Sequence, residues 1–108
     1  MPAKILVIED DIDGAELMRF QLEQAGYFVA IATDGTDGLR QTYAWQPDLI
    51  LLDVVLPIMS GWTVCERLCQ ITQVPIIFTS FLNDEESVIR GLRLGADDYI
   101  AKPFAHDE

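Results

Sequence analysis

Basic residues are scarce in this sequence. Its 108 residues include 7 lysines and arginines against 18 aspartates and glutamates, for a formal net charge of -11. Proteins that bind nucleic acids contact the phosphates through clusters of Lys and Arg. The charge balance therefore argues against direct binding of nucleic acid by this chain, and it leaves a cation site or solubility as uses for the surplus acids.

Long apolar runs are absent as well. No run approaches the ~20 residues of a membrane-spanning helix, and Met1-Pro2-Ala3-Lys4 is too short for a signal peptide. We therefore expect no contact with a membrane and a cytoplasmic location. Half of the residues are apolar, which favours one compact domain over disorder.

Cysteine and histidine are too few for a zinc site. Cys65 and Cys69 are the only cysteines, four residues apart on a predicted helix, and His106 is the only histidine. Structural zinc needs four such ligands. We interpret the two cysteines as small core or boundary residues on one helix face.

The most informative stretch is the apolar run from Leu49 to Leu52, which ends in Asp53. A run this short is typical of a strand buried on both faces, as in a parallel sheet covered by helices. Asp53 would then stand at the carboxyl end of the strand, where open α/β sheets place their ligands. Because burying a carboxylate is costly, we expect a metal or a charged partner beside it.

Strand-like and helix-like segments alternate along the chain. The expected strands are 4–8, 27–32, 49–53, 74–80 and 99–101, and the expected helices run from Asp11 or Asp13 to Gly26 and over 36–45, 60–71 and 83–95. This alternation predicts a parallel sheet with right-handed crossovers. Asp107-Glu108 is typical of the opening of a fifth helix. We therefore expect 1–108 to be one domain that is truncated before or within that helix.

Polar residues stand where these strands end. They are Glu9, Asp10, Asp53, Thr79, Ser80 and Lys102. Since the carboxyl ends of parallel strands share one edge, the side chains should converge there. Three like charges repel one another unless a cation intervenes, and oxygen ligands suit Mg²⁺ or Mn²⁺. A lysine and a hydroxyl beside the metal suit a phosphoryl group. Together they indicate phosphoryl transfer to Asp53 as the nucleophile.

These motifs resemble the response-regulator receiver domain of two-component signalling systems, the CheY-like superfamily. The resemblance rests on Glu9-Asp10, on Asp53 with Leu56-Pro57 and Gly61 behind it, on Thr79-Ser80 and on Lys102-Pro103-Phe104. It implies a flavodoxin-like, doubly wound five-stranded parallel sheet in the order 2-1-3-4-5. It also implies a phosphorylation-dependent switch, not an enzyme that turns over external substrates.

The resemblance assigns Asp53 as the acceptor of a phosphoryl group from the phosphohistidine of a sensor histidine kinase. The metal, Mg²⁺ or Mn²⁺, would be bound directly by Asp10, Asp53 and the Val55 backbone carbonyl, and by Glu9 through water. The structural alternative for Asp10, as for Asp11, is a helix cap.

Lys102, the Thr79 hydroxyl and the Ser80 backbone N–H would hold phosphoryl oxygens according to the same resemblance. Lys102-Pro103 would be a cis peptide. Tyr99 would be the switch aromatic, which turns inward when Thr79 moves towards the phosphoryl group. The structural alternatives are an ordinary strand residue for Thr79 and a plain core residue for Tyr99.

Segment 95–99 also resembles receivers joined to winged-helix DNA-binding domains, which implies a C-terminal output domain. The family resemblance also implies a homodimer through the fourth helix and fifth strand, which the residues present leave open. Val55 and Phe81, both near the acceptor, are apolar, which predicts a long-lived phospho-Asp53. Leu17 and Phe20 give the first helix a second apolar face, which is either flanking core or a docking surface.

Two rival functions are open. A phosphatase of haloacid-dehalogenase type also uses a strand-end aspartate with Mg²⁺, but it places a second acid two residues later, where Val55 stands here. A degenerate receiver would act only as a protein-interaction module, which the complete set of acids disfavours.

Overall fold

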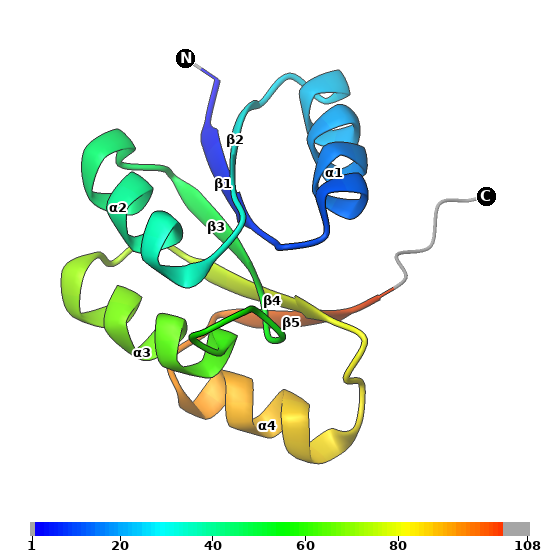
Figure 1. Ribbon diagram of the computed structural model, residues 1–108, viewed down its shortest axis with the longest axis vertical. Coiled ribbons are helices and arrows are strands. Elements are labelled where there is room, and N and C mark those ends of the chain that lie inside the picture. The colour runs from blue at the N-terminus through cyan, green and yellow to red at the C-terminus, as the bar shows by residue number, and fades with distance from the viewer. Residues whose placement is uncertain (1, 103–108) are drawn as a thin grey trace.

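The computed structural model describes residues 2–102 (Figure 1). Its elements are β1 (Lys4–Ile8), α1 (Ile12–Gln24), β2 (Phe28–Ala32), α2 (Gly35–Trp45), β3 (Leu49–Asp53), α3 (Gly61–Ile71), β4 (Ile76–Ser80), α4 (Glu85–Arg93) and β5 (Asp98–Ala101). The five strands are parallel in the order β2-β1-β3-β4-β5. The predicted flavodoxin-like fold is confirmed. The fifth helix at Asp107-Glu108 and the peptide before Pro103 lie outside the described residues.

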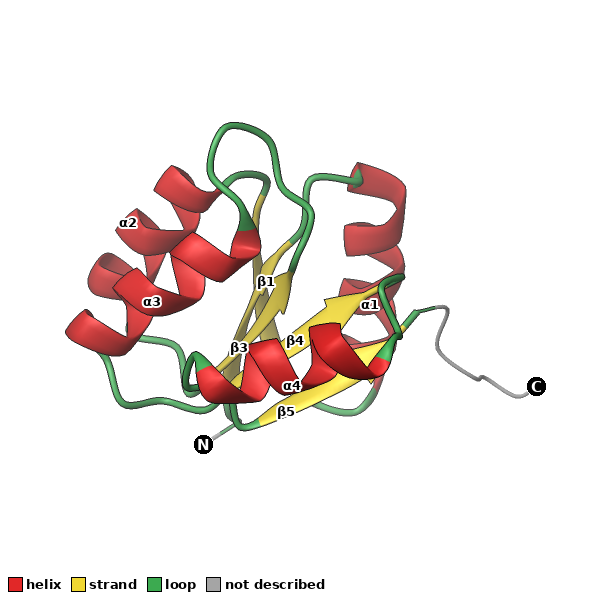
Figure 2. Ribbon diagram, turned by 90° about the horizontal axis from the view of Figure 1, so that it is seen from below, coloured by secondary structure: helices red, strands yellow, loops and turns green. Residues whose placement is uncertain are grey.

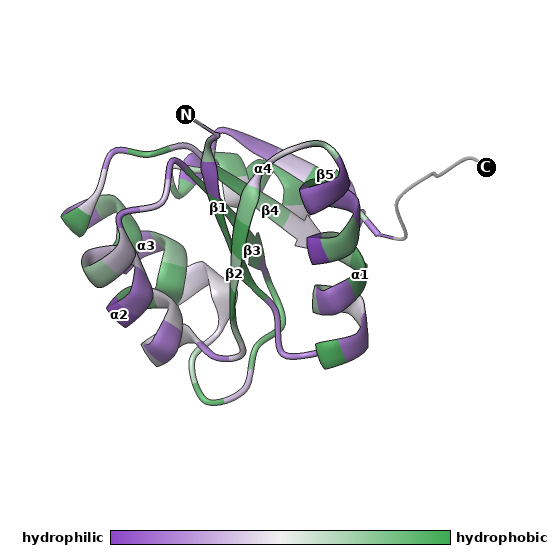
Figure 3. Cartoon of the chain, turned by 90° about the horizontal axis from the view of Figure 1, so that it is seen from above, coloured by the Kyte–Doolittle hydropathy of each residue, from purple (hydrophilic) through white to green (hydrophobic). Residues whose placement is uncertain are grey.

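β1 is buried on both faces, whereas β3 is buried at Ile50 and Leu52 on one face and only half-buried at Leu49 and Leu51 on the α1 face, less than the apolar run ending in Asp53 predicts. In β1, Leu6 and Ile8 join the core under α2 and α3, whereas Ile5 and Val7 pack with α1 on the other face. Figure 2 shows α2, α3 and α4 on one side of the sheet and α1 on the other. Figure 3 colours the chain by hydropathy: the inner strands β1 and β3 are largely green, whereas the helices around them carry both purple and green residues.

Helix boundaries follow local chemistry and differ from the predicted ones by at most two residues. The side chains of Asp34, Ser60 and Asp84 accept backbone N–H groups at the starts of α2, α3 and α4. Asp11 is the N-cap residue of α1, but its side chain makes no cap hydrogen bond. Gly26, with φ +98°, follows the end of α1 in the left-handed conformation that glycine tolerates.

The face of the sheet beside α1 has apolar surface that the described residues leave open. A groove of about 310 Å³ there is lined by Met18, Gln21, Leu22, Leu49, Leu51, Thr79 and Ile100. On α1, Leu17 and Phe20 are 51% and 61% exposed, so neither belongs to the core that the described residues form, and a docking surface at these residues stays a prediction. No helix among residues 2–102 combines the length and the apolar character needed to cross a bilayer.

Candidate functional site

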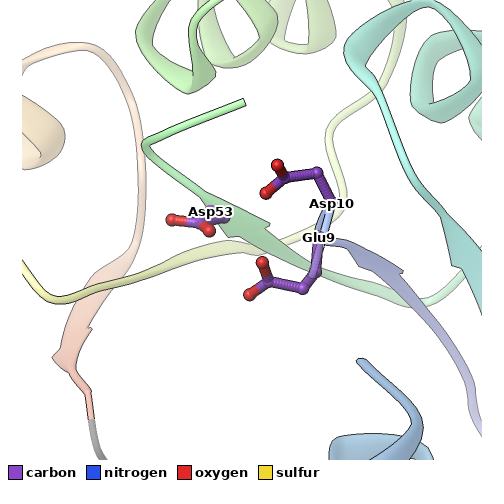
Figure 4. Close-up of side chains that lie close together, drawn as sticks. All are labelled: Glu9, Asp10 and Asp53. Atoms are coloured by element: carbon purple, nitrogen blue, oxygen red, sulfur yellow. The ribbon is translucent and has the colours of Figure 1, made fainter. Parts of the chain in front are cut away.

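Three carboxylates converge at the carboxyl ends of β1 and β3 (Figure 4). Glu9 and Asp10 follow β1, and Asp53 is the last residue of β3. Each offers an oxygen, and these oxygens lie within 4.8 Å of one another. Glu9 and Asp53 are buried, at 2% and 7% exposure, whereas Asp10 is exposed. The site therefore has two acids shielded from bulk solvent and one that faces it.

Lys102 supplies the positive charge of the site. Its ammonium donates to Asp53 Oδ2 at 3.2 Å and forms an ion pair with Glu9 Oε1. The backbone N–H of Lys102 donates to the Ser80 carbonyl at 2.6 Å, which fixes the start of this side chain beside β4. The predicted convergence of acids and ammonium is confirmed, with the addition that Glu9 is a direct partner of Lys102.

Burial and charge shift both members of this pair. Burial raises the pKa of the Glu9 carboxyl above its usual range, and the nearby Asp53 carboxylate adds to this effect while the bond to Lys102 opposes it. Burial lowers the pKa of the Lys102 ammonium, but the hydrogen bond to Glu9 and the charges of Asp53 and Glu9 outweigh it, so the pKa is raised. The ammonium is therefore charged at neutral pH.

The donor set fits a hard divalent cation. Three carboxylates and one ammonium leave a formal charge of two negatives, which such an ion would neutralise. Oxygen donors with one side open to water suit Mg²⁺ or Mn²⁺. Among residues 2–102 this is the one group of three or more His, Cys, Asp or Glu side chains close enough to share an ion.

Gly61 allows the loop after β3 to pack against Asp53. Its N–H donates to the Val54 carbonyl at 2.7 Å, and a Cβ at this position would lie 2.1 Å from the Asp53 carbonyl oxygen. Only glycine fits so close to a backbone. In the same loop the Val55 N–H donates to Asp53 Oδ1 at 3.2 Å, and the Val55 side chain is exposed. The motif match included Gly61, but its steric role depends on the path of the loop.

Thr79 and Ser80 end β4 next to β3, the strand that carries Asp53. Asp53 and Thr79 are register partners, and both hydroxyl-bearing residues are buried. The Ser80 Oγ accepts the Leu82 N–H at 3.0 Å. Position and burial thus agree with the predicted site, whereas the roles of Thr79 and Ser80 towards a phosphoryl group stay predictions.

Tyr99 lies on β5 and reaches the loop after β4. Its hydroxyl donates to the Leu82 carbonyl at 2.5 Å, and its ring lies 5.9 Å from that of Phe78. Burial raises the pKa of the Tyr99 phenol. This residue therefore links β5, β4 and the β4–α4 loop, which is the place that a switch aromatic would need.

The cysteines have the structural positions that the sequence predicts. On α3, Cys65 is buried and Cys69 is exposed, and both thiols contact the Leu94 carbonyl, at 3.9 and 3.7 Å. Both cysteines therefore lie on the face of α3 that contacts the end of α4, which confirms their interpretation as core and boundary residues.

A five-stranded 2-1-3-4-5 sheet with an acid cluster and a lysine at its carboxyl edge defines a receiver-type α/β domain. The family described as "Response regulator receiver domain" matches residues 5–108, and the chain belongs to that family.

Similar proteins agree with this assignment. A curated relative from Guillardia theta, named "Probable transcriptional regulator ycf27", is 37% identical over 105 residues; the match covers 97% of this chain and 41% of that protein. The BeF3-activated N-terminal receiver domain of Klebsiella pneumoniae RstA is 32% identical with a TM-score of 0.91, covering 95% of this chain and 88% of that one. A two-component response regulator from Clostridium difficile is 30% identical with a TM-score of 0.92, and the match covers 95% of this chain and 85% of that one.

Proposed function

We propose that this domain is a signalling switch that accepts a phosphoryl group on Asp53 from the phosphohistidine of a histidine kinase, with Mg²⁺ or Mn²⁺ bound. The observation that carries the proposal is the position of Asp53 between two further acids and the Lys102 ammonium. A cytoplasmic location, where such a kinase would present its phosphohistidine, is part of the proposal.

Each side chain has a task in the transfer. Asp10, Asp53 and the Val55 backbone carbonyl would hold the ion, with Glu9 acting through water. When bound, the ion would neutralise charge on the transferring phosphoryl group. An Asp53 oxygen attacks phosphorus, the bond from phosphorus to the imidazole nitrogen breaks, and the imidazole leaves with that electron pair. Lys102, already 3.2 Å from Asp53, then has a phosphoryl oxygen within reach, as do the Thr79 hydroxyl and the Ser80 N–H in this proposal.

The acyl phosphate would be read through β4 and β5. Thr79 neighbours Asp53 in register, and Tyr99 bonds to the loop that leads into α4. A local change of charge that moves Thr79 would shift the balance between two positions of Tyr99 and α4. A difference of a few kcal/mol between the two states suffices for such a population shift.

The test is phosphorylation by a small donor. Incubation with acetyl phosphate and Mg²⁺ should add ~80 Da to the intact mass, the increment of one acyl phosphate on a carboxylate nucleophile. Asp53→Asn should abolish this adduct, whereas the exposed Asp13→Asn should keep it. Turnover of added phosphoesters would favour a phosphatase, and an unmodified protein that still binds partners would favour an inert interaction module.

The rest of the signalling pathway is also a proposal. The chain spans about two fifths of the length of the curated relative it matches, and that relative is named as a transcriptional regulator. We infer an output domain beyond this one, with a DNA-binding winged helix as one option. A homodimer would use α4 and β5, and Ile89 and Leu92 of α4 are exposed there. Asp97, which directly precedes β5, accepts the Ile76 N–H at 2.9 Å and so fixes the start of β4.

A further inference from the structure

Phe81 has an exposed ring that nevertheless contacts the site. The residue directly follows β4, and 70% of it is open to solvent. The Lys102 Nζ lies 5.4 Å from the centroid of the Phe81 ring, within the range of a cation–π contact. The Lys102 side chain itself is only 11% exposed. A large apolar ring at the surface thus lies against the ammonium that faces Asp53.

Backbone pairing brings the two side chains together. Ser80 and Ala101 are the last register partners of the parallel strands β4 and β5, so Phe81 and Lys102 are the first residues after the two strands. Residues that continue a register in this way leave from the same face of a sheet and lie close enough to interact. The hydrogen bond from the Lys102 N–H to the Ser80 carbonyl extends the pairing by one step. The contact therefore follows from the register and not from a chance rotamer alone.

The ammonium needs support apart from its acids. Glu9 and Asp53 hold it while the site is empty of substrate, but Lys has a long, flexible stem. During transfer these acids would be shared with the ion and the phosphoryl group. The ring face attracts a cation electrostatically and excludes water from one side of it, and it makes no bond to the reacting atoms.

We propose that Phe81 is a positioning residue, which holds the Lys102 ammonium towards Asp53 through its ring face. The inference rests on the proposed function, because positioning matters for the transfer to Asp53. It predicts that the aromatic character of residue 81, and not its size, sets the rate of phosphorylation.

Two substitutions separate the ring from its volume. Phe81→Leu keeps an apolar side chain without a π face, and Phe81→Tyr keeps the π face. Phe20→Leu makes the same chemical change at an aromatic residue of α1 that is 61% exposed. The rate of the +80 Da adduct would be measured with acetyl phosphate at saturating Mg²⁺. We expect Phe81→Leu to slow it by about two- to five-fold, the worth of a cation–π contact at an exposed site, and Phe81→Tyr and Phe20→Leu to match the parent chain.

Nuclear magnetic resonance gives a readout that does not depend on phosphorylation. A ring stacked on Lys102 should move its Hε and Nζ-proton resonances upfield, and this shift should persist in Phe81→Tyr and vanish in Phe81→Leu. Equal rates for the Leu and Tyr variants, or Lys102 resonances that do not respond to the ring, would overturn the inference while Asp53 still gains its phosphoryl group. An adduct absent from every variant would instead overturn the proposed function.

Discussion

Replacing Lys102 with Met should destabilise the metal-free domain strongly. The substitution keeps an unbranched stem but leaves Glu9 and Asp53, both buried, without the ammonium that pairs with them. At the 3.2 Å separation from Asp53 and an effective dielectric constant of 20, the lost attraction is ~5 kcal/mol. Measured losses for broken buried ion pairs are about 3–5 kcal/mol, since one charge is left uncompensated. We therefore expect a loss of that size.

The loss should depend on pH and on metal. Without the ammonium, the pKa of Glu9 should rise further above its ordinary value of 4.5. The native state then binds more protons than the unfolded state, so the stability of the variant falls as pH rises from about 4.5 through that raised pKa. In the parent chain the raised pKa of Lys102 keeps its ammonium charged throughout this range, so each buried carboxylate that ionises has a positive partner. The deficit should be larger at pH 8 than at pH 5, and Mg²⁺ should reduce it.

Urea unfolding with EDTA or Mg²⁺ measures these differences. Arg40→Met is the matched control, because it removes the same charge from an ion pair with Asp37 in which the arginine side chain is 68% exposed. Exposed pairs contribute about 0–1 kcal/mol. A Lys102→Met deficit no larger than that of the control, or one independent of both pH and Mg²⁺, would refute the view that Lys102 balances the buried acids.

Three further predictions concern the loop after β3, the thiols and the acyl phosphate. Gly61→Ala should cost about 2–3 kcal/mol in urea unfolding, because its Cβ would meet a backbone oxygen at 2.1 Å. At pH 8 a disulfide reagent should modify the exposed Cys69 quickly. Cys65 should react only after denaturation, since burial raises its pKa to about 12 and lowers its thiolate population about a thousandfold relative to a thiol of pKa 9.0; two fast thiols in the folded chain would contradict this. Val55→Asn should shorten the lifetime of the phosphorylated Asp53 about tenfold, because the amide would align an attacking water; a full general base would give ~100-fold. An unchanged decay of the phosphorylated mass would contradict the view that the apolar Val55 prolongs the life of the acyl phosphate.

The sequence predicts the parts of the site that depend on topology. Once the strands are recognised as parallel, Asp53 and Lys102 must stand at one edge, and no side-chain detail is needed to bring them together. The choice of Glu9 as a direct partner of Lys102 depends on which acid turns inward, which residue type does not reveal. The close approach of Gly61 depends in the same way on the path of a loop. The start of β4 at Ile76 instead of Val74 reflects a proline, which lacks an N–H, at the intervening position.

The packing of α4 gives the proposed switch a short physical route. A Cβ on Gly91 would lie 2.9 and 3.0 Å from the rings of Phe78 and Tyr99, so the helix contacts both strands at closest approach where it lacks a side chain. Phe78 precedes Thr79, the register partner of Asp53, and is itself the register partner of Tyr99. Since packed side chains with no spare volume transmit small displacements, a shift of Thr79 after phosphorylation would reach α4 through two rings. The route needs no contact between α4 and the phosphoryl group itself.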